Sequence, residues 1–297
     1  MSLLSICDVV APAKLNLFLH VIGQRDDGYH LLQSVFVLID WCDSLHFERR
    51  SDGQVMRHDL GAALPADDLC VRAARALQAV SGCGLGVDIS IDKQVPWGAG
   101  MGGGSSDAAS TLLALNRLWN LNWPRSRLKA LGMTIGADVP FFIGGRNAFV
   151  EGIGERLTPL EVKPQWLAVL KPAGELETRA VFSSPLLARN TEAVILESFY
   201  TELSDTTIEI VEAYGRNDLQ PSAADLCQGV TTAANVLIEM YGNSRMTGSG
   251  TAVFARAGLV CNAPLVVPEF KVDIPRGWSG RMCKSLPQHP LLAWAEN

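Results

Sequence analysis

A dense run of glycines most constrains how this chain can fold. Five of the seven residues 98–104 are glycine, and Ser105 and Ser106 follow them. Glycine inside regular structure costs about 1 kcal/mol relative to alanine, so local stability does not explain this density. An alternating strand-like pattern at 87–91 precedes the run, and helically spaced apolar residues at 108–119 follow it. A glycine loop at a helix start directs backbone N–H groups at an anion, so we predict a phosphate site here.

The loop differs from three familiar phosphate-binding sequences. Gly98, Gly100 and Gly103 match G-x-G-x-x-G, but no acidic residue follows between Asp107 and Asp138 to hold a ribose. No Gly-Lys-Ser or Gly-Lys-Thr closes the run, and the H-R-D and D-F-G sequences of protein kinases are absent. A nicotinamide-dependent oxidoreductase therefore stays as an alternative that the loop disfavours. We expect Asp107 to cap the helix that follows the loop.

Charge and composition limit the partners and the compartment. The net charge is -6 and the pI is near 5.4, whereas a nucleic-acid-binding protein needs a strong basic footprint. No apolar run approaches the roughly 18 residues of a membrane span. The seven cysteines are scattered without a C-x-x-C pair, and the five histidines lack metal-ligand spacing. We expect a cytoplasmic protein with free thiols and with small anions, rather than nucleic acid or membrane, as its partners.

The pattern along the chain predicts an α+β protein of two lobes. A period of two after Ala11-Pro12 indicates a strand, and an apolar segment at 35–39 follows the turn at 23–28. Asp67 or Asp68 can cap a helix that Gly82 ends. Glycines and prolines at 152–164 place a boundary between lobes 1–162 and 163–297. In the second lobe we expect helices near 206–214 and 226–241 and strands near 166–170, 251–256 and 278–283.

Asp138 is a carboxylate in an apolar segment, beside Val139, Phe141 and Phe142. An unpaired buried charge is costly, so the side chain must be paired or functional. Lys14 is its natural partner, because it lies on a strand with leucines on the opposite face. The residues alone leave a catalytic pair and a structural ion pair equally open.

Three segments together resemble the GHMP kinase superfamily, named for galactokinase, homoserine kinase, mevalonate kinase and phosphomevalonate kinase. They are residues 12–17 (PAKLNL), 96–106 (PWGAGMGGGSS) and 246–251 (MTGSGT). The resemblance implies a β-rich N-terminal lobe with a left-handed crossover in its α/β core. It also implies a C-terminal lobe of helices on an antiparallel sheet, with ATP and Mg²⁺ as cofactors.

Three narrower segments, at 23–30, 101–106 and 135–142, resemble one branch of that superfamily. Its members phosphorylate the 2-hydroxyl of a methylerythritol carried on cytidine diphosphate, in the non-mevalonate route to isoprenoids. The resemblance thus implies a small-molecule kinase whose substrate is a cytidine diphosphate sugar alcohol. A homoserine or mevalonate type of kinase is the alternative within the superfamily. A nucleotide-binding sensor without catalysis is a third hypothesis, which the presence of both Lys14 and Asp138 disfavours.

The resemblance also assigns roles to single residues. Asp138 is expected as the base and Lys14 as the group that polarises the hydroxyl, while Phe36 is expected in the core. The residues expected to bind substrate are Asn16, Tyr29, His30, Phe182, Gly248, Ser249 and Gly250. The residues expected to bind ATP are Asp68, Leu69, Lys93, Pro96, Trp97, Gly98, Ala99, Gly100, Met101, Gly102, Gly103, Gly104, Ser105 and Ser106. Backbone dipoles, Lys14, Lys93 and Mg²⁺ would offset the phosphate charge, and Ser106 and Asp138 are the plausible protein ligands of the ion.

Overall fold

The fold is taken from a computed structural model, which describes residues 3–65, 68–195, 215–260 and 267–297. Two sheets with helices on them give the mixed α+β architecture that the patterns predict. The helix expected at 206–214 and the alternative cap Asp67 lie outside the described residues. None of the helices in the described ranges has the length and apolarity that a membrane crossing requires.

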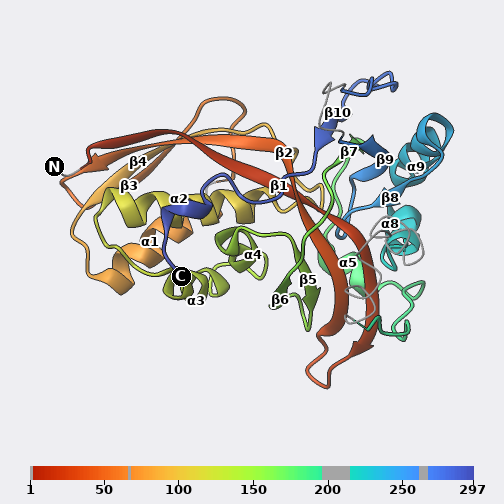
Figure 1. The fold of residues 1–297 in the computed structure, drawn as a ribbon, viewed down its shortest axis with the longest axis horizontal. Coiled ribbons are helices and arrows are strands. Elements are labelled where there is room, and N and C mark those ends of the chain that lie inside the picture. The colour runs from red at the N-terminus through yellow and green to blue at the C-terminus, as the bar shows by residue number, and fades with distance from the viewer. Residues whose placement is uncertain (1–2, 66–67, 196–214, 261–266) are drawn as a thin grey trace.

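The first sheet has the strand order β3-β4-β2-β5-β6, with β1 paired to β2. Its two long strands, β1 (Ser5–Gln24) and β2 (His30–Arg50), are antiparallel and run the length of the molecule (Figure 1). β3 (Val55–Asp59) lies parallel to β4 (Gly86–Asp92), and the chain crosses between them through α1 (Leu69–Ser81). β5 (Ala148–Glu151) and β6 (Arg156–Pro159) extend the other edge.

Four helices cover one face of this sheet (Figure 1). Besides α1 they are α2 (Gly103–Leu118), α3 (Arg125–Met133) and α4 (Val139–Gly144). Apolar side chains of α1 and α2 pack on Leu45, Phe47 and Ile89 of the sheet in one buried cluster. The expected limits of α1 are confirmed, because Asp68 accepts a hydrogen bond from the Val71 N–H and Gly82 ends the helix in the left-handed conformation.

The second sheet is antiparallel, in the order β10-β7-β9-β8. Its strands are β7 (Gln165–Lys171), β8 (Arg245–Met246), β9 (Val253–Leu259) and β10 (Ser279–Lys284). Its helices are α5 (Thr178–Ser183), α8 (Gln220–Leu226) and α9 (Gln228–Tyr241). The expected helix near 226–241 and the three expected strands are thereby confirmed.

The two sheets share a core where β1 and β2 cross onto β7. Leu15 and Val37 of the first sheet are fully buried in one cluster with Leu167 of β7. The chain also returns to the first sheet at its end, where the 3-10 helix η1 (Leu292–Trp294) packs near α2 and the Arg125 N–H donates to the Glu296 carbonyl. The first lobe therefore includes residues from both ends of the chain.

Candidate active site

A cavity of about 290 Å³ lies between the glycine loop and the start of α1. All the residues expected to bind ATP line it except Ser106, which is fully buried. The hydroxyl of Ser106 has no hydrogen-bond partner among the described residues. The sequence did not indicate three further lining residues, Leu64, Cys70 and Ile91, and it indicated Asp107 only as a helix cap. The cavity therefore extends from the glycine loop to the start of α1.

Positive backbone φ angles shape the glycine loop. Gly98, Gly100 and Gly102 have φ of 61°, 72° and 69°, a region that other residues rarely adopt. Gly102 is the N-cap of α2, and within the described residues no side-chain hydrogen bond caps the helix there. The expectation that Asp107 caps this helix was wrong, because α2 begins at Gly103 and Asp107 lies inside it. The first N–H groups of α2 are therefore left for an anion.

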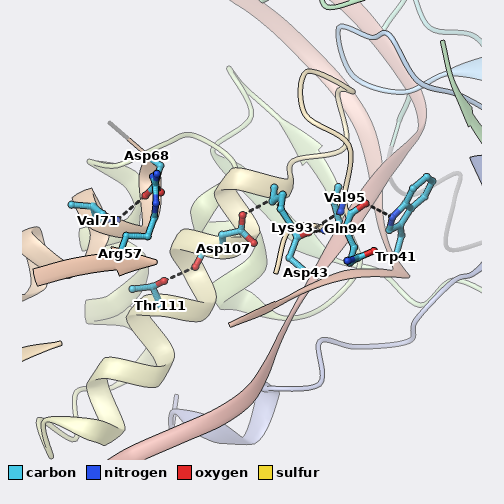
Figure 2. Close-up of polar contacts among 10 residues, drawn as sticks. All are labelled: Trp41, Asp43, Arg57, Asp68, Val71, Lys93, Gln94, Val95, Asp107 and Thr111. Atoms are coloured by element: carbon cyan, nitrogen blue, oxygen red, sulfur yellow. Dashed lines mark hydrogen bonds and ion pairs between the residues drawn. The ribbon is translucent and has the colours of Figure 1, made fainter. Parts of the chain in front are cut away.

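Lys93 lies between two carboxylates beside this cavity (Figure 2). Its Nζ contacts Asp43 and is 2.6 Å from Asp107 Oδ2. Burial raises the pKa of Asp107 well above its usual range and the charge of Asp43 raises it further, while Lys93 opposes both effects. Burial tends to lower the pKa of Lys93, but Asp107 and Asp43 more than compensate and raise it. The positive charge of Lys93 is thus already matched, so its structural effect is to brace the loop.

Asp68, the N-cap of α1, lines the cavity and also makes contacts that hold the fold together. Its Oδ1 caps the helix at Val71, and its Oδ2 contacts the guanidinium of Arg57 on β3 (Figure 2). Arg57 also pairs with Asp59 on the same strand, at 2.8 Å. These contacts fix α1 against β3 and hold the wall of the cavity in place.

A second cavity, of about 240 Å³, lies on the other side of the glycine loop. Gly100 and Gly102 line both cavities, so the loop separates them. The second cavity is lined by Lys14, Asn16, Asp138, Phe182, Gly248 and Ser249 from the predicted site. The fold thus brings together residues that are more than 200 positions apart in the sequence, from β1, α4, α5 and the loop before β9. Ligands bound in the two cavities would therefore lie on opposite sides of the glycine loop.

Lys14 and Asp138 come together in the second cavity. Lys14 Nζ is 3.7 Å from Asp138 Oδ2 and donates a hydrogen bond to Asn16 Oδ1 at 2.6 Å. Burial lowers the pKa of Lys14, and the carboxylate of Asp138 partly offsets that effect. The Asp138 side chain is 30% exposed and lines the cavity. Its carboxylate therefore remains accessible to a hydroxyl in the cavity while it pairs with Lys14.

Asn16 connects Lys14 to the second lobe. Its backbone N–H donates to Thr247 Oγ1 at 2.9 Å, and its Nδ2 donates to Ser34 Oγ at 2.9 Å. Thr247 Oγ1 in turn donates to Asn16 Oδ1 at 3.2 Å. Phe36 is buried in the core as expected, yet it also lines the cavity, and Lys14 Nζ lies 4.4 Å from its ring centroid. Thr247 and Ser34 were missed because only the fold brings them to Asn16.

Replacing Thr247 by valine is expected to lower kcat about tenfold and to destabilise the protein by roughly 1–3 kcal/mol. The change preserves the shape but leaves the buried Asn16 N–H without its acceptor and loosens the support of Lys14. Thermal unfolding and steady-state kinetics measure the two effects.

Thr251 offers a matched control on the same loop. Its side chain is also fully buried, but its hydroxyl has no partner among the described residues. Thr251→Val should therefore leave stability unchanged or raise it. Equal effects of Thr247→Val and Thr251→Val would contradict the role assigned to the Thr247 hydroxyl.

At the lobe interface the glycine loop contacts a second loop, residues 247–252, through backbone atoms. The Thr251 N–H donates to the Gly98 carbonyl and the Ala252 N–H donates to the Ala99 carbonyl, both at 3.1 Å. A Cβ on Gly100 would lie 2.3 Å from the Thr247 carbonyl oxygen. Gly250 lines neither cavity but belongs to this contact. The second lobe thus sets the position of the glycine loop through backbone contacts.

Of the three residues expected to recognise a base, Phe182 lines the second cavity, whereas His30 and Tyr29 do not. The ring of His30 is 5.0 Å from the ring of Phe182, which lines the cavity. Tyr29 is 60% exposed on the β1–β2 turn and does not line it. The fold therefore brings His30 and Phe182 together, while Tyr29 stands on the turn beside them.

No group of three or more His, Cys, Asp or Glu side chains in the described part of the chain is placed to hold a metal ion. The six cysteines within it have free thiols.

Comparison with known proteins identifies close relatives. Residues 68–146 match the GHMP kinases N terminal domain. The 4-diphosphocytidyl-2-C-methyl-D-erythritol kinase of Methylibium petroleiphilum is 62% identical, over 99% of this chain and 100% of that protein. The protein of the same name from Albidiferax ferrireducens is 53% identical, over 98% of this chain and 96% of that protein.

Solved structures show the same similarity. A crystal structure of 4-(cytidine 5'-diphospho)-2C-methyl-D-erythritol kinase superposes with a TM-score of 0.69 at 34% identity, over 86% of this chain and 90% of that one. Homoserine kinase from Cytophaga hutchinsonii superposes with a TM-score of 0.70 at 15% identity, over 96% of this chain and 95% of that one. The second match concerns the fold alone.

Proposed function

The chain belongs to the 4-diphosphocytidyl-2-C-methyl-D-erythritol kinase family of the GHMP kinases, and we propose that its two cavities hold ATP and the cytidine diphosphate substrate. The enzyme is a small-molecule kinase that uses ATP to phosphorylate the 2-hydroxyl of 4-diphosphocytidyl-2-C-methyl-D-erythritol, in isoprenoid precursor synthesis. One observation carries the division between the cavities. The glycine loop lines both of them, and Lys14 and Asp138 lie on the acceptor side.

Asp138 acts in this proposal as the general base. It accepts the proton of the substrate hydroxyl, the hydroxyl oxygen forms the bond to the γ-phosphorus, and the bond to ADP breaks. Lys14 donates to the same oxygen and stabilises the charge that develops on it. The 3.7 Å between Lys14 Nζ and Asp138 Oδ2 supports this division, because it leaves room for both groups to contact one oxygen.

The first N–H groups of α2 and the glycine loop hold the triphosphate in the first cavity. Asp68 and Leu69 line its far side, where the base of ATP would lie. Mg²⁺ would neutralise phosphate oxygens. Oxygen donors suit this ion, and the partly exposed Asp138 carboxylate and the unpartnered Ser106 hydroxyl are the protein groups that fit it. ATP oxygens and water would supply the remaining ligands.

Recognition of the cytosine is assigned to Phe182, which lines the second cavity, and to Tyr29 and His30 beside it. Phe182 and Tyr29 stack on the base from opposite sides, and His30 reads its edge. The ring contact of 5.0 Å between His30 and Phe182 supports this placement. Gly248 and Ser249 contact the substrate from the second lobe, where Ser249 Oγ is 2.9 Å from Thr178 Oγ1.

The lobe boundary at 162/163 and a cytoplasmic location belong to the same proposal. The strands before β7 form the first sheet and β7 to β10 form the second, while the last residues of the chain return to the first sheet. The free thiols favour a reducing compartment.

The nicotinamide alternative does not agree with the fold. Its G-x-G-x-x-G match follows β4, which pairs antiparallel with β2, whereas a dinucleotide-binding fold needs a parallel sheet on both sides of that strand.

The test of the proposed function is ADP release with Mg²⁺, ATP and a panel of acceptors. We expect turnover with 4-diphosphocytidyl-2-C-methyl-D-erythritol and only background ATPase activity with homoserine or mevalonate. Background rates with the cytidine compound would contradict the proposed substrate.

A further inference from the structure

A guanidinium group fixes the protonation of His30. Arg189 Nε donates a hydrogen bond to His30 Nε2 at 3.2 Å. Because an arginine nitrogen can only donate, Nε2 must carry the lone pair. The proton of the neutral imidazole therefore resides on Nδ1, and Nδ1 makes no hydrogen bond within the described ranges. The imidazole thus offers a ligand one N–H donor and no acceptor.

Arg189 is held in place by the chain around Phe182. Its Nη2 donates to the carbonyls of Phe182 at 3.1 Å and Ser184 at 3.2 Å, and its Nη1 donates to that of Leu187 at 3.2 Å. The guanidinium therefore links the end of α5, which carries Phe182, to His30 on β2. One side chain sets both the orientation of the histidine and the position of the neighbouring ring.

The surroundings keep His30 neutral. Burial lowers the pKa of His30, and the positive charge of Arg189 lowers it further. The adjoining β1–β2 turn carries Arg25, Asp26 and Asp27, of which Arg25 and Asp27 pair with each other at 2.7 Å. Asp26 is exposed to solvent, and Arg189 is the charged side chain that contacts His30 and acts on its pKa.

We propose that Arg189 is a positioning residue for base specificity, which holds His30 in the Nδ1–H form and thereby selects cytosine over uracil. The inference rests on the proposed function and adds Arg189, with the fixed tautomer of His30, to its account of base recognition. The ring nitrogen N3 of cytosine is an acceptor, whereas N3 of uracil carries a hydrogen. A fixed Nδ1–H pairs with the first and opposes the second. A histidine free to exchange tautomers would accept either base.

The test compares kcat/KM for the cytidine substrate and its uridine analogue between pH 6 and 8.5. In the wild type the ratio of the two should favour cytidine and stay constant with pH. In Arg189→Met, the ratio at pH 8 should fall roughly tenfold, because His30 can then expose a lone pair at Nδ1. The pKa of His30 would also rise toward its ordinary value of about 6.5. Protonation below that pH restores the Nδ1–H, so the cytidine preference should return as the pH falls.

Arg189→Lys retains a charge and a donor, and it should keep most of the preference. Nitrogen NMR of labelled histidine in the wild-type enzyme, assigned with a His30→Gln variant, should show Nδ1 protonated and Nε2 bare throughout. This measurement does not depend on the folding of any Arg189 variant. Protonated Nε2 in the wild type would overturn the inference, as would an equal, pH-independent loss with both substrates in Arg189→Met. Absence of wild-type turnover with the cytidine compound would instead contradict the proposed function.

Discussion

Asp138→Asn is expected to lower kcat by about 10²–10⁴-fold, the range attributed to a positioned general base. The amide has the same shape but cannot take the proton of the substrate hydroxyl. Because Asp138 lines the acceptor cavity and not the ATP cavity, the KM for ATP should change little. Single-turnover kinetics at saturating substrate measure the loss in the chemical step.

Turnover, and not stability, separates this role from that of a structural ion pair. Lys14 is buried, so Asp138→Asn leaves its ammonium without the carboxylate 3.7 Å away and should destabilise the protein in either role. The loss of turnover in the folded variant should therefore be measured well below its own melting temperature. Asp52→Asn, which removes a carboxylate from the exposed ion pair with Arg50, is the matched control and should affect neither quantity. Near-wild-type turnover in Asp138→Asn would show that its carboxylate only braces Lys14.

Elements defined by local chemistry could be predicted from the sequence. α1 begins at the cap Asp68 and ends at the left-handed Gly82, as the residues indicated. β4 follows the alternation of apolar residues at 87–91. The cap of α1 joins residues three positions apart, and the alternation in β4 is itself a pattern of neighbours, although the strand pairs with the distant β2 and β3.

The sequence was less informative where the fold supplies the contacts. Asp107 was expected as a cap, but the positive φ of Gly102 starts α2 earlier and buries Asp107 against Lys93. The neutralisation of Lys93 also depends on Asp43, 50 positions away, which no local pattern indicates. Thr247 contacts Asn16 across 231 positions for the same reason.

The ligand residues show the same division. The glycine loop predicts an anion site from sequence alone, because such a density of glycine does not stabilise the local structure. The sequence does not determine the tautomer of His30, because a neutral imidazole can offer a ligand both a donor and an acceptor. Arg189 removes the acceptor, and this residue lies 159 positions from His30. Specificity is therefore the part of the site that depends most on tertiary contacts.

A single added methyl group in the glycine loop should have the second large effect on activity. Gly100→Ala is expected to lower kcat/KM for ATP by at least about 10²-fold, since small displacements of reacting groups cost that much. The new Cβ would lie 2.3 Å from the Thr247 carbonyl oxygen, and Gly100 has a φ of 72°. Both the contact and the strain involve backbone, so no side-chain rotation can relieve them.

Gly104→Ala separates this contact from the loss of a glycine as such. Gly104 lies in the first turn of α2, and its Cβ would approach only the Leu69 side chain, at 3.7 Å. That variant should keep its melting temperature, whereas Gly100→Ala should lose roughly 1–3 kcal/mol of stability from strain. The loss corresponds to a fall in Tm of several degrees. If Gly100→Ala kept both its Tm and its ATP kinetics, the loop around Thr247 would have to yield, and the second lobe would not set the position of the phosphate loop.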